Sequence, residues 1–150
     1  MGFSVARTFY YYNILQLRTP SNKEFKQICD YIQEFELDNR GLKGQEFTAA
    51  FRDEELVGFG RLRKHSDSTE LCSLGVISNY RRKGIGKSIV KELIKRAEES
   101  IYLVCIIPEF FRPFGFQVVS TFPSSIQNKI DYCTSELVVP EIYVAMALEK

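Results

Sequence analysis

The sequence contains no tryptophan, one histidine (His65) and four cysteines, none of which form a C-x-x-C pair. The usual spacing of zinc ligands is therefore missing, and we expect no metal site. No apolar run approaches twenty residues and none opens the chain, so we expect neither a membrane span nor a signal peptide, and hence a cytoplasmic protein. Cys29, Cys72 and Cys105 lie among apolar neighbours and are expected to be reduced and buried.

A strong excess of charge of either sign is also missing, because the net charge is +1 over 150 residues. Nucleic-acid binding needs a concentrated excess of lysine and arginine, so nucleic acid is not an expected partner. The chain is 45% hydrophobic and 26% charged, which is ordinary for a globular protein. We expect a single domain over residues 1–150 that folds without disulfides or metals.

The apolar residues follow two periodicities, which predict an α/β fold. Alternation with period two predicts strands, and spacing of three and four predicts helices. A capping box at Ser21 and Glu24 predicts the start of the first helix. Three strands in a row imply antiparallel hairpins, while a strand–helix–strand unit implies a parallel pair. The fold class is therefore a mixed, mainly antiparallel sheet with helices on both faces. Expected strands are 14–18, 47–51, 56–62, 70–77, 101–107 (buried on both faces), 115–119 and 142–148; expected helices are 25–35, 84–99 and a short piece from 108, and 120–136 has an irregular pattern.

The most informative stretch runs from the end of strand 70–77 through a basic loop into a helix. The first turn of a helix has N–H groups without internal partners, and the peptide dipoles add positive charge there. Glycines at 84 and 86 remove the Cβ atoms that would keep an anion away from the backbone. This combination favours a phosphate group at the helix start. The residues expected to hold it are Arg81, Arg82, Lys83, Gly84, Ile85, Gly86, Lys87 and Ser88.

Three other interpretations of this turn differ in how well the residues match them. The simplest is an ordinary helix start with basic surface residues. A P-loop would match Gly86-Lys87-Ser88, but its first glycine would fall at Arg81, and no acidic metal-binding pattern accompanies the turn as a nucleotide-dependent kinase would require. A dinucleotide fingerprint needs a third glycine where Ile89 stands.

The segment R-x-x-G-x-G, from Arg81 to Gly86, resembles the acetyl-CoA signature of the GNAT superfamily, (Q/R)-x-x-G-x-(G/A). The aromatic segment from Phe110 to Phe116, which ends in Gly-Phe, is similar to the second motif of that family. The resemblance covers about residues 46–119. It implies a GNAT-like fold, with the parallel strands 70–77 and 101–107 splayed apart, and an acetyl-CoA-dependent N-acetyltransferase.

The resemblance also implies roles for residues of strand 70–77. The backbone of Leu74, Gly75 and Val76 would pair with the pantetheine arm, and the Leu74 amide would face the thioester oxygen, where a well-placed donor contributes about 3 kcal/mol. Glu70, at the edge of an apolar cleft, is the candidate base that deprotonates the acceptor amine, directly or through water. The alternative is that Glu70 is an exposed carboxylate at a strand end.

The sequence departs from the family at the general acid. Many members have a tyrosine where this chain has Phe111, and a phenyl ring can only form a wall of the cleft. Tyr132 and Cys133 are substitutes to consider. Cys105 as an acyl-carrying nucleophile is disfavoured, because such enzymes need a nearby base and His65 is the sole histidine.

The acceptor is the least determined part. Residues 115–124 and Tyr132 resemble the end of amino-acid-acetylating members, including the acetyltransferase domain of N-acetylglutamate synthases. We therefore expect a small-molecule amine such as an amino acid, with Arg61, Arg63 and Arg112 as candidates for binding its carboxylate. Acetylation of a peptide or protein amine, and an acyl-CoA sensor without turnover, are the alternatives. The aromatic start, 9–12, packs either within the fold or against a second subunit of a homodimer.

Overall fold

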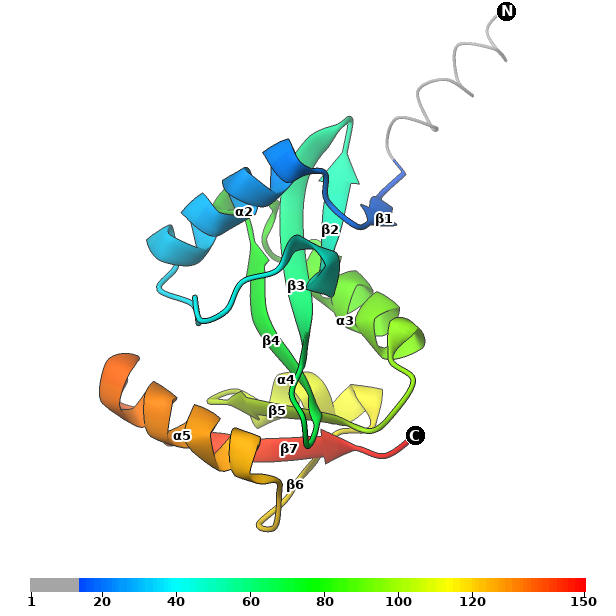
Figure 1. Ribbon diagram of the computed structural model, residues 1–150. Helices are drawn as coiled ribbons and strands as arrows, with labels where there is room; N and C mark the ends of the chain where they lie inside the picture. Colours follow the sequence, from blue (N-terminus) through cyan, green and yellow to red (C-terminus); the bar gives the residue numbers. More distant parts are fainter. Residues whose placement is uncertain (1–13) are drawn as a thin grey trace, which may run out of the picture.

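A seven-stranded mixed sheet forms the centre of the protein, as the computed structural model of residues 14–150 shows (Figure 1). The aromatic start predicted to pack on the fold or on a partner lies outside these described residues. Within them, none of the helices has the length and apolar character needed to cross a membrane. The strands are β1 (Gln16–Arg18), β2 (Phe47–Arg52), β3 (Glu55–Lys64), β4 (Thr69–Val76), β5 (Ile101–Cys105), β6 (Gln117–Val118) and β7 (Val144–Leu148). The helices are α2 (Asn22–Glu34), α3 (Ile85–Arg96), α4 (Pro108–Phe111) and α5 (Ser124–Glu136).

The strand order is β1-β2-β3-β4-β5-β7-β6, and among these described strands β4 and β5 are the one parallel pair. The turn between β2 and β3 is made by Asp53 and Glu54, both at positive φ, which suits a two-residue hairpin turn. The α3 crossover joins the parallel pair, as the strand–helix–strand pattern predicted. The predicted fold class is therefore confirmed.

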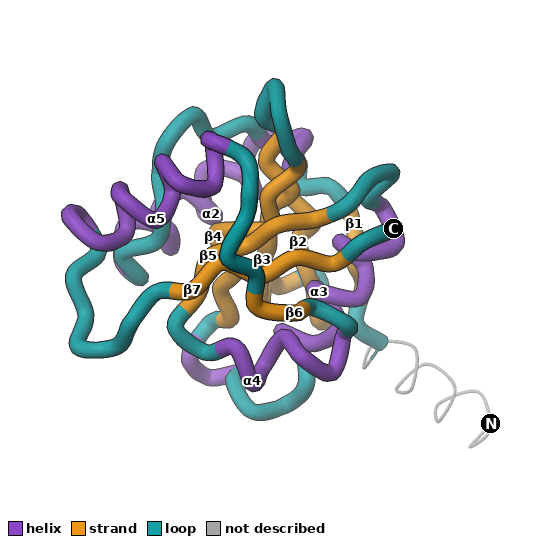
Figure 2. The backbone as a smooth tube through the Cα atoms, turned by 90° about the horizontal axis from the view of Figure 1, so that it is seen from below, coloured by secondary structure: helices purple, strands orange, loops and turns teal. Residues whose placement is uncertain are grey.

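The helices cover both faces of the sheet. Figure 2 shows α2 and α5 together on one side of the strands, with α3 and α4 on the other. The α3 side holds the larger apolar core, and a second core lies under α2. Gly58 and Gly60 allow α3 to lie close to β3, because a Cβ at either position would come within 3.0 Å of the Ile89 side chain.

Helix α2 has well-defined ends, and its C-terminus leads directly to the site described below. Ser21 and Glu24 form the predicted capping box. At the other end, the amides of Glu36 and Leu37 donate to the carbonyls of Gln33 and Ile32, the Schellman arrangement. Glu36 occupies the left-handed position where glycine is usual, with φ of 56°.

Three expectations about secondary structure were wrong. The stretch 120–136, which looked irregular, contains helix α5. Its buried face consists of Ile126, Lys129 and Cys133, and the lysine interrupts the apolar spacing that would have revealed it. Strand β5 ends at Cys105 rather than continuing to Ile107, and its residues alternate between buried and partly buried instead of being buried on both faces. The strand predicted at 115–119 is reduced to the two residues of β6.

Candidate cofactor and acceptor site

Strands β4 and β5 separate soon after they meet. They pair only at Thr69 with Ile101 and at Glu70 with Tyr102. Beyond Glu70 the edge of β4 that faces β5 has no strand beside it in the described part of the chain. The predicted splayed pair is therefore present, and an extended ligand could add to the free edge of β4 in the way a strand would.

A bulge in β4 lies where the strands part. Against β3, Cys72 pairs with Arg61 and Gly75 pairs with Phe59, so that Ser73 and Leu74 have no register partner in either neighbouring strand. Ser73 has a φ of 50°, and its hydroxyl donates to the Asp38 carbonyl over 2.9 Å. A bulge of this kind redirects backbone groups away from the sheet. It bears directly on Leu74, whose amide was predicted to face the thioester oxygen.

The start of α3 presents a row of free backbone donors. Gly84 is the N-cap in the left-handed conformation, with φ of 79° and no capping side chain. Within residues 14–150, no acceptor meets the amide N–H groups from Arg82 to Lys87; the first helical bond runs from the Ser88 amide to the Gly84 carbonyl. A Cβ at Gly86 would stay 3.6 Å or more from its neighbours. Unpaired N–H groups at a helix start suit an anion.

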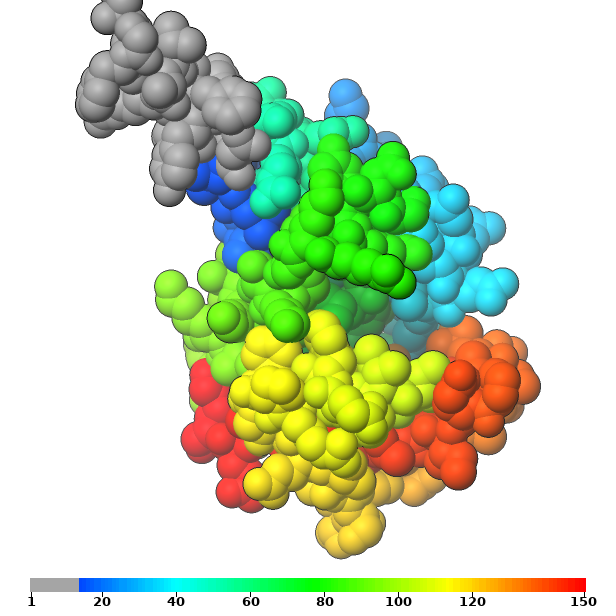
Figure 3. All heavy atoms as spheres, turned by 180° about the vertical axis from the view of Figure 1, so that it is seen from behind, coloured from blue at the N-terminus to red at the C-terminus, as the bar shows by residue number. Residues whose placement is uncertain are grey.

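Two side chains of this turn, Arg81 and Ser88, form hydrogen bonds to main-chain carbonyls. Arg81 donates from Nε to the Val76 carbonyl over 2.9 Å, and its guanidinium lies 5.1 Å from the centre of the Phe35 ring. The Ser88 hydroxyl donates back to the Gly84 carbonyl over 3.2 Å. Both side chains therefore bind main-chain carbonyls of neighbouring residues. Figure 3 shows the green loop of residues 78–84 above the yellow α4, with a hollow between them.

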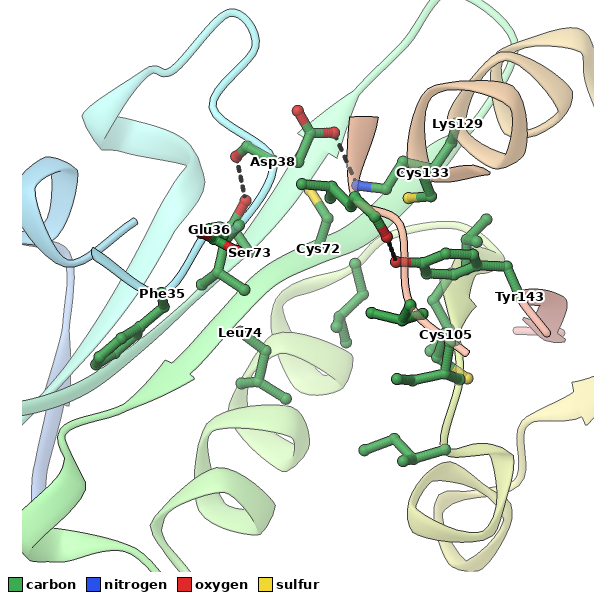
Figure 4. Close-up of a pocket in the computed structure, with 18 of the residues that line it drawn as sticks. Phe35, Glu36, Asp38, Cys72, Ser73, Leu74, Cys105, Lys129, Cys133 and Tyr143 are labelled. Carbon is green, nitrogen blue, oxygen red and sulfur yellow. Dashed lines mark hydrogen bonds and ion pairs between the residues drawn. The ribbon is translucent and has the colours of Figure 1, made fainter. Parts of the chain in front are cut away.

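A cavity of about 620 Å³ lies between the separated strands. Residues 71–74 of β4 form one wall, and residues 103–107, from the second half of β5 and just beyond it, form another. The segment that follows α2, the C-terminal half of α5 and Tyr143 form the side shown in Figure 4. Leu74 and Phe111 line the cavity, as predicted, whereas Gly75 and Val76 do not.

Glu70, the candidate base, is not at the cleft edge, and the alternative of an exposed carboxylate is also wrong. Its side chain is 0% exposed and does not line the cavity. Its Oε1 lies 2.8 Å from His65 Nε2, and its Oε2 lies 3.0 Å from Lys129 Nζ. Lys129 does line the cavity and also binds Asp38 Oδ2 at 2.8 Å (Figure 4). Lys129 therefore stands between Glu70 and the loop after α2.

Asp38 and Lys129 stabilise one another in their ionised forms. Burial alone raises the pKa of Asp38, but hydrogen bonds from Arg40 and the charge of Lys129 outweigh it and hold that pKa well below its usual range. Burial alone lowers the pKa of Lys129, and the negative charges around it, with Glu70 and Asp38 among them, raise it above the usual value. Lys129 is thus a fixed ammonium and cannot accept a proton from an acceptor amine.

The thiols and hydroxyls near the cavity are poorly suited to nucleophilic chemistry. Burial raises the pKa of Cys72 to about 12, and it also raises the pKa of Cys105 and of Cys133. All three line the cavity and all are unpaired. Cys29, expected to be buried, is only partly buried. Tyr132 does not line the cavity. The centre of its ring lies 3.8 Å from the guanidinium carbon of Arg40.

Tyr143 is a cavity residue that the sequence did not single out. Burial raises its pKa, so its hydroxyl keeps its proton, which it donates to the Leu137 carbonyl over 2.5 Å. The hydrogen bond holds the segment between α5 and β7 against the cavity. No spacing in the sequence relates Tyr143 to the motifs before Val119, so only the fold brings it here.

None of the arginines proposed to bind a carboxylate lines the cavity. Arg61 is 0% exposed and is held by Glu46 and by the carbonyls of Arg40 and Gly41. Arg63 approaches Asp38 at 3.9 Å. Arg112 lies beside Glu109 on the surface at α4.

The comparison with protein families agrees with this geometry. The model of the acetyltransferase (GNAT) family matches residues 11–116. That span includes the free edge of β4, the start of α3 and α4, and it leaves out α5 and β7. The acceptor side of the cavity is thus formed partly by residues outside the match.

Solved structures share the fold at low sequence identity. N-acetylglutamate synthase from Neisseria gonorrhoeae, complexed with coenzyme A and N-acetyl-glutamate, superposes with a TM-score of 0.72 at 17% identity, over 91% of this chain and 35% of that chain. The Rv2747 protein of Mycobacterium tuberculosis, in complex with CoA, superposes with a TM-score of 0.73 at 18% identity. The match covers 90% of this chain and 99% of that chain. Naa50 of Arabidopsis thaliana, in complex with a bisubstrate analogue joining CoA to a peptide, superposes with a TM-score of 0.62 at 18% identity. The match covers 91% of this chain and 99% of Naa50. The chain thus spans about a third of the length of the synthase.

Proposed function

The chain belongs to the GNAT acetyltransferase family and uses acetyl-CoA, and from this we propose that it acetylates the primary amine of a small molecule, such as an amino acid, by direct attack. The observation that carries the proposal is the separation of β4 from β5 next to a helix start with free amides. The helix start does not line the cavity but follows the end of β4, and a Cβ at Gly86 would lie 3.7 Å from the Val76 side chain. A cofactor bound at the helix start and along the free edge of β4 would therefore bring its thioester to the cavity, where an amine can be held against it.

We assign the cofactor to the residues predicted from the sequence. The free amides from Arg82 to Lys87 would bind the pyrophosphate, with Lys83 and Lys87 adding charge, and the Leu74, Gly75 and Val76 backbone would pair with the pantetheine arm. Arg81 and Ser88 would shape the turn through their bonds to Val76 and Gly84. Acetyl-CoA supplies the thioester carbonyl that the amine attacks.

Leu74 is the proposed oxyanion donor. Its amide lies in the bulge of β4, and its side chain lines the cavity. A main-chain donor fixed by a bulge needs no reorganisation during the reaction, which is what makes such a group effective. The walls around it are apolar at Leu103 and Phe111, which keeps water away from the acyl group.

Glu70 is the proposed base, acting through water. Direct contact with the amine is excluded by its burial, since it does not line the cavity. His65, which is partly exposed and contacts Glu70, offers a way for the proton to leave. Direct attack is favoured over an acyl-cysteine because burial keeps the cavity thiols protonated.

The substitution Glu70→Gln is expected to lower kcat about a hundredfold, the scale of general base catalysis. The affinity for acetyl-CoA should stay the same, because the amide replaces the carboxylate in shape and lies away from α3. Steady-state kinetics measure the first effect and calorimetry the second. The matched control is Glu92→Gln, a surface carboxylate paired with Arg96. An unchanged kcat would remove Glu70 from the reaction.

An assay of CoA release with a thiol reagent tests the proposed function. Purified protein, acetyl-CoA and a panel of small amines should release CoA only when both substrates are present. Release with short peptides and with no small amine would favour the alternative of peptide or protein acetylation. Tight binding of acetyl-CoA without release on any amine would instead support a sensor. The cytoplasmic location, the homodimer and the single domain over 1–150 stay predictions.

A further inference from the structure

We propose that the acceptor is an amine with an apolar substituent and no carboxylate, and that the substituent lies on the segment between α5 and β7. The inference rests on the proposed function and narrows its acceptor to small amines without a carboxylate, which excludes the free amino acid given there as an example. Two independent features carry it: the charge of the cavity lining, and an apolar surface that continues from the cavity mouth.

The charged lining of the cavity is mainly acidic. Within the described residues, Glu36, Asp38 and Glu136 line it, and Lys129 is the one basic side chain that does. Lys129 is already bound by Asp38 at 2.8 Å and lies 3.0 Å from Glu70. Glu36 and Glu136 are exposed residues of this lining, and within residues 14–150 neither forms an ion pair, so their negative charge attracts an ammonium and repels an acid group.

The segment after α5 exposes large apolar side chains beside this cavity. Val138 is 77% exposed and Ile142 is 83% exposed, and Ile107 and Val139 are also exposed. Ile107, Val138 and Val139 line the cavity itself. Exposed apolar side chains that gather in one place, rather than being scattered, indicate a binding surface.

A second hollow extends the cavity along this segment. It has a volume of about 250 Å³ and is lined by Val138, Val139, Ile142, Thr134, Glu141 and Tyr143. Val138, Val139 and Tyr143 belong to both hollows. The hydrogen bond from Tyr143 to the Leu137 carbonyl holds the shared wall in place. An acceptor with its amine in the cavity would therefore extend its substituent over Val138 toward Ile142.

The two features select the same kind of molecule. A free amino acid carries its carboxylate next to the amine, where the residues that the structure describes around the cavity offer carboxylates and no free cation. Removing the negative charge, as in an amide, removes the repulsion, and an apolar side chain gains contact with the second hollow. The shared chemistry is an ammonium with a neutral, apolar substituent.

An acceptor panel separates the two effects. Leucinamide, leucine, glycinamide and glutamate are compared by kcat/KM at saturating acetyl-CoA. Leucinamide should exceed leucine about tenfold because of the carboxylate, and should exceed glycinamide about tenfold because of the apolar group. Leucine equal to leucinamide, or glutamate as the best acceptor, would overturn the inference while leaving the acetyltransferase function intact. No release of CoA with any amine would overturn both.

The substitution Val138→Ser tests whether the preference for an apolar substituent arises at the segment between α5 and β7. It should reduce the ratio of leucinamide to glycinamide about tenfold, to near one. The control is Val118→Ser, an exposed valine on β6 that lines neither hollow, which should keep the ratio. Melting temperature and light scattering are measured on both variants. An unchanged ratio in Val138→Ser would overturn the inference, and so would a dimer that this substitution dissociates, because a second copy would then cover the surface.

Discussion

Replacing Gly86 by aspartate is expected to weaken coenzyme A binding about a thousandfold and to leave the fold intact. Gly86 lies among the free amides at the start of α3. Two like charges about 4 Å apart at a partly exposed site repel by about 4 kcal/mol, which corresponds to that factor. A side chain fits there, because its Cβ would stay 3.6 Å from Phe110 and 3.7 Å from Val76. Calorimetry with coenzyme A measures the loss.

The matched control is Gly86→Asn, which has the size of aspartate without its charge. It should lose much less affinity than Gly86→Asp, and both should melt close to the wild type. Equal losses in the two variants would show that space rather than charge matters at this position. Unchanged affinity in Gly86→Asp would refute the assignment of the pyrophosphate to this turn.

The second large effect is expected at Lys129. Replacing it by methionine should lower the free energy of unfolding by about 3–5 kcal/mol, because Asp38 and Glu70 would remain buried without their shared cation. Urea denaturation at pH 7 measures this. The control is Lys91→Met, an exposed lysine on α3, which should change stability by about 0.5 kcal/mol or less.

The effect of Lys129→Met should also depend on pH. The pKa of Asp38 is depressed in the folded wild type, so its contribution to stability is present above its unfolded-state pKa, about 3.9, and is lost as pH falls below that. Without Lys129, the buried carboxyl gains less from being ionised. The difference between variant and wild type should therefore be largest near pH 7 and should shrink as pH is lowered below about 4. A difference that is independent of pH would show that Lys129 acts through packing alone.

The parts of the fold that were predicted correctly depend on neighbours in sequence. Ser21 and Glu24 form the capping box because a helix N-terminus requires those donors and acceptors three residues apart. The turn from Gly84 to Lys87 could be recognised for the same reason, since its glycines and amides are consecutive. Helix α5 was missed because Lys129 occupies a core position, and only partners outside the helix make that burial favourable.

The acceptor side of the site also depends on contacts between segments that are far apart in the sequence. Asp38 follows α2, Glu70 lies on β4, Lys129 on α5 and Tyr143 before β7, and no spacing links them. The role of Glu70 as the base stays a prediction, and its burial against Lys129 could not be foreseen from the sequence. The arginines considered for a carboxylate looked available in the sequence, and Arg61 is instead enclosed by Glu46 and two carbonyls.

The amino-acid sequence by itself determined the α/β class, the helix start with its row of free amides and the family to which the chain belongs, because these are properties of contiguous residues and local hydrogen bonds. The tertiary structure alone decided which charges meet in the core, which arginines stay away from the cavity and which apolar side chains surround its mouth. Those depend on contacts between segments far apart along the chain, where a buried charge is tolerated only if another segment brings its partner.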